Sequence, residues 1–298
     1  MFHENRGRGR TTLDPKLDIV FWMLFGAEQN RSLLISLLNA VLQPRVPIES
    51  AEVLHAQPDR VGVDDKSIAL DVRVRLASGE QIDVEMQSQR RPAQRERSLY
   101  YWARLYAGQL RRGASYTDLR RCVVILITNY SELATARFHS RFRLRQDHGA
   151  EVLTDQLEIH LLELPKLRNA AHQNDEPNLT AWDNFLLAAS DEDLETLAME
   201  NPVLKQAKDA LDRLSADDEA RMRAEQREMA EISYALDMGA MRRQGIASVV
   251  QHLLTVKFGE LAPGVQERLV GASEPELQRW SERLLSATSL EDVFEGPR

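Results

Sequence analysis

The stretch that most constrains the fold is residues 68–87, IALDVRVRLASGEQIDVEMQ, in which apolar and polar side chains alternate in two runs. Side chains of a β-strand point alternately to opposite faces, so this pattern predicts two strands that each have one apolar and one polar face. The segment between the runs, 77–80, contains Gly79, which can adopt the positive φ that a tight turn often needs. The stretch therefore predicts a β-hairpin.

The hairpin brings two carboxylates together on its polar face, because Asp71 lies roughly opposite Glu85. Directly opposed side chains are about 5 Å apart, and like charges at that distance repel. A divalent cation would remove the repulsion, since hard cations such as Mg²⁺ bind carboxylate oxygens. The alternative is an ordinary amphipathic hairpin with a solvated polar face, and the spacing alone leaves both open.

Asp71 followed by Glu85-Met86-Gln87 resembles the core motif of PD-(D/E)xK nucleases, with Gln87 in place of the usual Lys. The flanking segments resemble, in the same order, the Rpn family of recombination-promoting nucleases, which are also described as transposases. The resemblance runs from about Leu13 to about Leu164. The segments that carry it are LDPKLDIVFWMLFG (13–26), LLISLLNAVL (33–42), LDVRV (70–74), VEMQ (84–87) and RSLYYWARLYAGQL (97–110).

The resemblance implies an α/β fold with a three-layer α/β/α, restriction-endonuclease-like core around a mixed sheet. It also implies that Asp71 and Glu85 bind one or two Mg²⁺ ions, for which Mn²⁺ can substitute, with the backbone carbonyl of Met86 as an extra ligand. The usual motif Lys orients water and stabilises negative charge, whereas the amide of Gln87 is neutral and acts only through hydrogen bonds. Asp71, Glu85 and Gln87 are the predicted catalytic residues.

A further acidic residue, Asp18, lies in the first turn of a helix that we expect to start at Asp14 and Pro15. Many PD-(D/E)xK enzymes carry an acidic residue on the first helix that assists metal binding, and the resemblance makes Asp18 the candidate. The alternative role is to complement the positive end of the helix dipole.

Charge is distributed unevenly along the chain. The net charge is −8, but residues 86–145 contain 13 Arg and three acidic residues, a net charge of +10, so the remainder carries −18. Arginine binds phosphate through a planar fork of donors, and phosphate contacts supply much of the affinity for nucleic acids. The block predicts a DNA-binding surface or, alternatively, a solvated helix face. The candidate DNA-binding residues are Arg90, Arg91, Arg97, Arg104 and Arg111.

Other segments predict the remaining layers of the core. Helical spacing of apolar residues predicts helices over about 30–42 and 93–112. The apolar run at 122–128 predicts a central strand covered on both faces, and residues 141–145 and 157–164 predict two paired strands. Helices on both sides of a mixed sheet give a three-layer core.

The predicted helix over 93–112 has two distinct faces. Arg97, Arg104 and Arg111 recur every seven residues and share a face, which would contact DNA or water. The opposite, apolar stripe is predicted to pack on the sheet. Its members are Leu99, Trp102, Ala103, Tyr106 and Leu110.

At 298 residues the chain is long enough for about two domains. We expect a flexible tail over 1–12, a nuclease-like domain over 13–205, a charged linking helix over 206–240 and a helical domain over 241–298. The last region resembles the small helical domain often appended to Rpn-type nucleases, and nothing in it suggests chemistry. We expect it to serve oligomer or partner contacts, with the linking helix helping to form a dimer.

Composition limits the location and the partners. No apolar run approaches the roughly 18 residues that span a bilayer, and the N-terminus lacks the apolar stretch of a signal peptide. The one cysteine, Cys122, fits a reducing cytosol, and the seven His show no metal-ligand spacing. We therefore expect a cytoplasmic homo-oligomer, a dimer, that binds DNA, contacts no membrane and uses no organic cofactor.

Together these features predict a Mg²⁺-dependent endodeoxyribonuclease that hydrolyses phosphodiester bonds in DNA recombination or mobile-element biology. Two alternatives stay open: a nuclease-fold protein that binds DNA with little or no cleavage, and an interaction module whose C-terminal helices are the functional part. The retained pair Asp71 and Glu85 favours the enzyme, whereas Gln87 and the net acidity favour the alternatives.

Overall fold

The computed structural model describes residues 11–54, 72–168 and 176–295. The chain divides into two compact units, Met1–Glu228 and Met229–Arg298. The described part of the first unit holds a six-stranded sheet of order β1-β2-β3-β4-β6-β5. The strands are β1 (Ala51–Val53), β2 (Val72–Leu76), β3 (Gln81–Gln87), β4 (Cys122–Thr128), β5 (His139–Arg143) and β6 (Leu157–Glu163). Strands β3, β4 and β6 run parallel and the other neighbours pair antiparallel, so the sheet is mixed, as predicted.

The predicted hairpin is formed by β2 and β3. Val72 pairs with Val84 and Val74 with Ile82, which is the register on which the sequence prediction was based. Gly79 in the turn has a φ of +87°, a left-handed conformation that glycine adopts without a steric cost. Asp71 lies outside the described residues.

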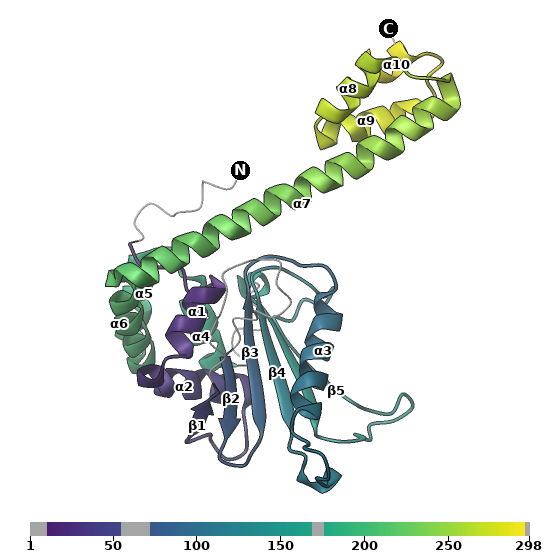
Figure 1. Ribbon diagram of the computed structural model, residues 1–298. Coiled ribbons are helices and arrows are strands. Elements are labelled where there is room, and N and C mark those ends of the chain that lie inside the picture. The colour runs from purple at the N-terminus through teal and green to yellow at the C-terminus, as the bar shows by residue number, and fades with distance from the viewer. Residues whose placement is uncertain (1–10, 55–71, 169–175, 296–298) are drawn as a thin grey trace. The chain divides into compact units, whose positions relative to one another are not determined.

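Helices cover both faces of the sheet, with α3 (Gln94–Ala107) on one side and α1, α2, α4 and α6 on the other (Figure 1). The second group packs on the apolar face in one continuous core. Its helices are α1 (Asp18–Phe25), α2 (Arg31–Leu42), α4 (Pro177–Leu187) and α6 (Pro202–Ala216). Phe21, Phe25 and Trp182 form an aromatic cluster in this core. The three-layer α/β/α architecture is confirmed.

Several helix boundaries differ from the sequence prediction. Helix α1 begins at Asp18, because the side chain of Asp14 accepts a hydrogen bond from the backbone N–H of Lys16 at 3.0 Å and holds a turn instead of capping the helix. Helix α3 ends at Ala107, well before residue 112. The side chain of Gln109 then bonds the backbone of Arg120 in both directions and turns the chain back toward β4. Arg111 is therefore not on the helix.

The predicted apolar stripe of α3 is correct only in part: Trp102 and Tyr106 are half-buried, and Nε1 of Trp102 donates to the carbonyl of Cys122 in β4 at 3.1 Å. Leu99 is 52% exposed and Ala103 is exposed, whereas Gln94 and Ser98 are buried. The helix packs over a sheet face that carries carboxylates, and polar side chains suit that face better than leucine does.

The predicted linking helix over 206–240 is two helices. Helix α6 ends at Ala216, and its leucine and alanine side chains lie in the core of the first unit. Asp217 is extended and caps the next helix, α7 (Asp218–Phe258), through the N–H of Ala220 at 2.8 Å. Helix α5 (Asp191–Glu200) precedes α6.

The second unit is helical, as predicted. Its core combines residues of α7 with those of α8 (Pro263–Gly271), α9 (Glu274–Leu284) and α10 (Leu290–Glu295). Gly259, at a φ of +86°, follows the end of α7, and Ser273 begins α9 with a capping box. Across the described residues, no helix combines the length and apolarity that a membrane span requires.

A buried chain of polar contacts joins β5 and β6. His139 bonds Glu176 at 2.9 Å through Nδ1 and His160 at 2.8 Å through Nε2. His160 in turn bonds Glu158 at 2.7 Å, and Glu158 pairs with Arg143 at 2.5 Å and with Arg121 at 3.0 Å. Edge strand β5 is therefore fixed by charge as well as by its ladder.

These contacts set the protonation states of Glu158 and His160. Burial raises the pKa of Glu158, but hydrogen bonds from His160 and Arg143 and the charge of Arg121 outweigh it and bring the pKa to about 2. Burial lowers the pKa of His160, against the hydrogen bond to Glu158. At neutral pH the network therefore holds an ionised Glu158 and a neutral His160.

The lowered pKa of Glu158 makes its contribution to stability depend on pH. The contribution is on the order of 3 kcal/mol; it is fully present above the ordinary glutamate pKa and is lost as the pH falls toward 2. We expect Glu158→Gln to lower the free energy of unfolding at pH 7 and to flatten its fall between pH 5 and pH 3, measured by urea denaturation. Glu151→Gln, at an exposed position, is the control. Equal pH slopes for wild type and Glu158→Gln would contradict this role.

Candidate active site

The carboxylates of β3 lie between the sheet and α3. Asp83 and Glu85 are 2% and 3% exposed, so the carboxylates on the polar face of the hairpin are buried and not solvated. Burying ionised carboxylates is costly unless charges or hydrogen bonds compensate for the lost water. The residues that surround these two carboxylates therefore define the site.

Asp83 and Glu85 are both held at raised pKa. Burial raises the pKa of Asp83 to about 6, against the charge of Arg73, whose Nε is 3.7 Å from Oδ1. Burial, and then the charge of Asp83, raise the pKa of Glu85 to about 7, against the charge of Arg97. Neither arginine approaches closely enough to restore the ordinary pKa of its partner.

One oxygen of Glu85 has two polar neighbours. Nε2 of Gln87 donates to Oε1 of Glu85 at 2.6 Å, and Nη2 of Arg97 is 3.9 Å from the same atom. Arg97 is held in turn by Tyr101, since it donates to the hydroxyl at 2.8 Å and lies 5.6 Å from the ring centroid. The Gln of the motif and an arginine of α3 therefore meet at one carboxylate oxygen.

Several buried polar atoms of β3, of α3 and of the loop after β4 have no hydrogen-bond partner within the described part of the chain. They are Oε2 of Glu85, both side-chain ends of Gln94, Nε of Arg97 and the hydroxyl of Tyr130. The charges of Glu85 and Arg97 both act on Tyr130, which places it beside them. Unpartnered buried polar groups are rare in proteins, and a cluster of them indicates a place for ions, water or a polar ligand.

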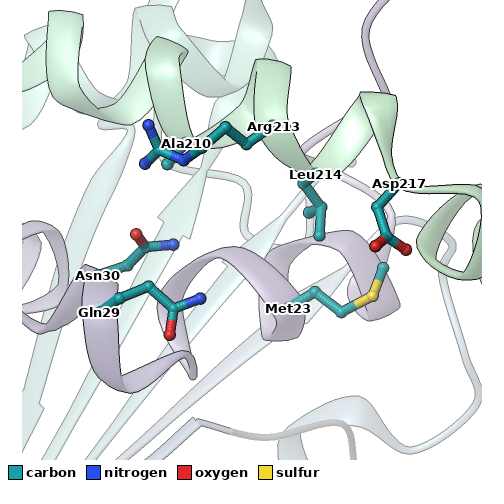
Figure 2. Close-up of a pocket in the computed structure, with 7 residues that line it drawn as sticks. All are labelled: Met23, Gln29, Asn30, Ala210, Arg213, Leu214 and Asp217. Atoms are coloured by element: carbon teal, nitrogen blue, oxygen red, sulfur yellow. The ribbon is translucent and has the colours of Figure 1, made fainter.

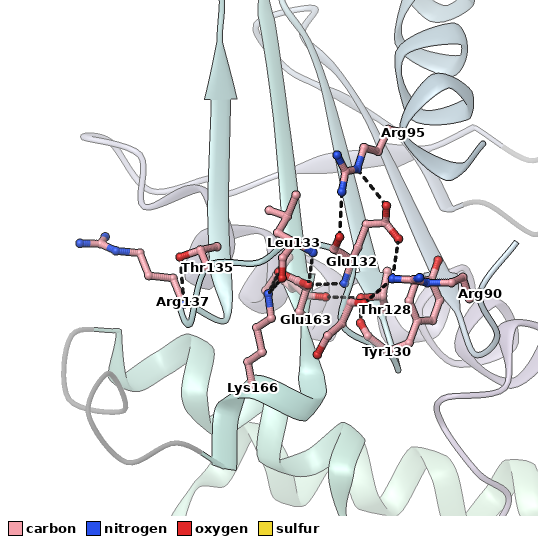
Figure 3. Close-up of polar contacts among 12 residues, drawn as sticks. Arg90, Arg95, Thr128, Tyr130, Glu132, Leu133, Thr135, Arg137, Glu163 and Lys166 are labelled. Carbon is pink, nitrogen blue, oxygen red and sulfur yellow. Dashed lines mark hydrogen bonds and ion pairs between the residues drawn. The ribbon is translucent and has the colours of Figure 1, made fainter. Parts of the chain in front are cut away.

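The loop after β4 is tied to β6 by charge (Figure 3). Oε1 of Glu163 accepts from the backbone N–H of Glu132 at 2.5 Å and of Leu133 at 2.9 Å. Nζ of Lys166 donates to the carbonyl of Leu133 at 2.8 Å and to the other oxygen of Glu163 at 2.6 Å. The buried pair Glu163 and Lys166 thus sets the path of the loop.

The same loop holds the start of α3. The carboxylate of Glu132 pairs with Arg95 at 2.8 Å and with Arg90 at 3.3 Å (Figure 3). Arg90 also donates to the carbonyl of Ser131 at 2.6 Å and lies 5.8 Å from the ring centroid of Tyr130. These contacts fix the beginning of α3, and with it Arg97, relative to the ends of β3 and β4.

The structure brings some of the predicted site residues together and separates others. Glu85 and Gln87 meet at the carboxyl end of β3, while the side chain of Met86 points into the apolar core. Arg91 contributes charge to Glu85. Arg104 lies farther along α3 and is exposed, and Arg111 is exposed in the turn after it. Asp71, the other predicted metal ligand, falls in the part of the chain that is not described.

Asp18 is held in a different set of contacts. Its carboxylate accepts from Nε of Arg227 at 2.9 and 3.0 Å and from Nη2 of the same side chain. The backbone N–H of Ile19 donates to Oδ1 at 2.7 Å. Both side chains of the Asp18–Arg227 pair are buried, and Arg227 comes from α7. Asp18 thus joins α1 to α7, and its role at a metal stays a prediction.

A cavity of about 230 Å³ lies elsewhere, between α1, the 3₁₀ turn Glu28–Asn30 and α6 (Figure 2). Among the predicted site residues that the structure describes, none lines it. Its lining residues are Met23, Gln29, Asn30, Ala210, Arg213, Leu214 and Asp217.

The oxygen atoms of Glu85 could supply part, but not all, of a binding site for a hard cation such as Mg²⁺. No group of three or more His, Cys, Asp or Glu side chains that could hold a metal occurs among residues 11–54, 72–168 and 176–295. Within that part of the chain, Glu85 supplies a buried carboxylate oxygen without a hydrogen-bond partner, which is a ligand type that Mg²⁺ prefers. Glu85 therefore fits as one ligand of a site that needs further oxygen donors.

The family model of the PD-(D/E)XK nuclease family transposases matches residues 15–238. The chain belongs to this family. No curated protein and no solved structure gives a significant match. Membership identifies the core as restriction-endonuclease-like and supports a nuclease-type function, for which PD-(D/E)XK nucleases typically use divalent metals. The match extends past residue 205, where we expected the nuclease-like domain to end, into α7.

The sequence analysis did not identify Gln94 and Tyr130, whose side chains have buried polar atoms that find no hydrogen-bond partner among the described residues. One signal was available for Tyr130, which follows directly after the buried run of β4. In α/β folds, ligands gather beyond the carboxyl ends of parallel strands, and β3 and β4 are parallel. Gln94 gave no signal of its own, because a polar residue in the first turn of a helix is ordinary.

The Asp18–Arg227 pair makes a prediction that separates a structural from a metal-binding role. Asp18→Asn should lower the free energy of unfolding by roughly 3–5 kcal/mol, because it leaves Arg227 buried beside a neutral amide. Urea denaturation measures the loss, and the double variant Asp18→Leu, Arg227→Met should recover most of it. A loss of Mn²⁺ binding in Asp18→Asn with little change in stability would instead assign Asp18 to the metal.

Proposed function

We propose that the chain is a metal-dependent endonuclease that hydrolyses phosphodiester bonds of DNA, in recombination or mobile-element biology. The observation that carries the proposal is the buried Glu85 carboxylate, with one oxygen held by Gln87 and the other without a partner within the described residues, in a chain of nuclease family. A buried carboxylate with one oxygen that accepts no hydrogen bond destabilises the fold, so a purely structural role would not explain it.

Asp71, Glu85 and the backbone carbonyl of Met86 would hold Mg²⁺, for which Mn²⁺ would substitute. The bound ion would polarise the scissile phosphate and lower the pKa of a coordinated water. In the overall reaction the water oxygen forms a bond to phosphorus, one P–O ester bond breaks, and a proton of the water passes to the leaving oxygen or to solvent. Gln87 orients polar groups beside Glu85 through hydrogen bonds and transfers no proton.

The arginines around α3 supply the affinity for DNA. Arg104 and Arg111 are exposed, so they are available to phosphates. Arg90 and Arg91 lie between β3 and α3, where Arg90 also ties down the loop after β4. Substitutions of Arg104 and Arg111 therefore test DNA contact alone, whereas a substitution of Arg90 would also disturb the loop after β4.

Cleavage of supercoiled plasmid with Mg²⁺ or Mn²⁺ tests the reaction. Wild type should cut. The cleavage rates of Glu85→Gln and Asp71→Asn should each fall about 100-fold or more, because each substitution removes a ligand of the metal ion that polarises the phosphate. Glu96→Gln, which removes an exposed carboxylate from α3, is the matched control and should cut normally. Calorimetric titration with Mn²⁺ should show weaker binding to Glu85→Gln. Salt-sensitive DNA binding without any cutting would favour the non-cleaving alternative.

DNA binding should follow counterion release. Without divalent metal, log affinity for a duplex should fall linearly with log salt concentration, and Arg104→Gln or Arg111→Gln should each reduce the slope by about 1. Fluorescence anisotropy across a salt series measures this. Arg279→Gln, an exposed position outside the basic block, should leave the slope unchanged. An unchanged slope in both test variants would remove these two residues from the DNA-binding surface.

A further inference from the structure

Arg97 is partly buried beside a carboxylate, whereas an arginine that only contacts DNA phosphates would be exposed. Its side chain is 35% exposed, and Nη2 lies 3.9 Å from Oε1 of Glu85, the oxygen that also accepts from Gln87. Gln87 stands where the family motif has its Lys. The guanidinium of Arg97 and the side chain of the motif position therefore converge on one atom.

From this convergence we infer that Arg97 supplies the positive charge that Gln87 cannot. In this role Arg97 is a catalytic residue that contacts the scissile phosphate and stabilises negative charge on its non-bridging oxygens during hydrolysis. It donates hydrogen bonds and transfers no proton. The inference rests on the proposed nuclease function and assigns a role in that reaction to a residue first considered only as a DNA contact.

The geometry of the pair argues against a purely structural role. Arg227, by comparison, binds Asp18 through direct hydrogen bonds from two nitrogens. Arg97 and Glu85 are separated by 3.9 Å, beyond hydrogen-bond distance. Arg97 is also oriented from outside the pair, by the hydroxyl and ring of Tyr101.

The guanidinium of Arg97 has a hydrogen-bond donor that an anion could accept from. Nε of Arg97 is buried without a hydrogen-bond partner in the described part of the chain. A planar fork of donors matches the oxygens of a phosphate, so a phosphate group can satisfy what the protein leaves open. The contacts of Glu132 with Arg95 and Arg90 fix the start of α3 and thereby hold this fork beside Glu85.

The test uses the full chain and a second-site rescue. With Mg²⁺ and saturating plasmid, Arg97→Gln should cut about 100-fold more slowly than wild type, and Arg97→Lys should keep part of the rate. Adding Gln87→Lys to Arg97→Gln should restore at least about tenfold, because the motif position again carries a cation at the same oxygen. Arg279→Gln, which replaces an exposed arginine outside the basic block, should leave the rate unchanged.

Mn²⁺ binding without DNA gives a readout that is independent of cleavage. Removing a neighbouring cation should leave the Mn²⁺ affinity of Arg97→Gln equal to that of wild type or tighter, with the melting temperature monitored for folding. Weaker Mn²⁺ binding in Arg97→Gln would overturn the inference, since Arg97 would then only position Glu85. Cutting by Arg97→Gln within threefold of wild type, or a double variant as slow as the single one, would also overturn it.

The failure of this inference differs from the failure of the proposed function. Wild type that never cuts DNA with either metal overturns the proposed function and this role together. Wild type that cuts, beside an Arg97→Gln variant that cuts equally well, overturns only the role of Arg97.

Discussion

The burial of Glu85 beneath α3 is the constraint on which the rest of the site depends. A carboxylate in a dry environment needs compensation, and here it comes from a neutral amide at 2.6 Å and a distant guanidinium at 3.9 Å. That compensation is incomplete, because the pKa is raised to about 7 and Oε2 has no partner among the described residues. Evolution retains such costs mainly at functional sites, where strain or unsatisfied groups are part of the chemistry.

The two faces of the sheet have different roles: one packs in the hydrophobic core and the other carries the candidate site. The apolar face packs against α1, α2, α4 and α6 in a continuous core that includes Val84 and Ile125, and it supplies most of the stability. The face under α3 combines the buried carboxylates of β3 with buried apolar side chains of β4, such as Val124 and Leu126. The pair Glu163 and Lys166 sets the loop after β4, and the pair Glu132 and Arg95 ties the start of α3 to that loop. A helix held this way keeps Arg97 beside the Glu85 carboxylate.

The sequence predicted the sheet better than it predicted α3. Period-two alternation, a glycine turn and the apolar run of β4 each depend on short-range chemistry, so the hairpin register and the central strand were correct. The buried face of α3 was predicted only in part, because helical periodicity assumes an apolar partner and the sheet face under the helix also contains Asp83 and Glu85. Arg111 was misplaced because the return of the chain at Gln109 depends on tertiary hydrogen bonds to Arg120. The resemblance of VEMQ to a nuclease motif pointed to Glu85, but no local pattern could show that Arg97 lies beside it.

Replacing the motif Lys by Gln changes what the neighbouring helix must provide. A lysine at position 87 would bring its own cation to Glu85 from the same strand, whatever helix covers the site. With an amide there, positive charge near Oε1 comes from outside the strand, and α3 with its ties to Glu132 delivers it. The position of α3 then matters electrostatically as well as sterically. The charged loop that anchors the start of this helix therefore also determines how close that positive charge lies to Oε1.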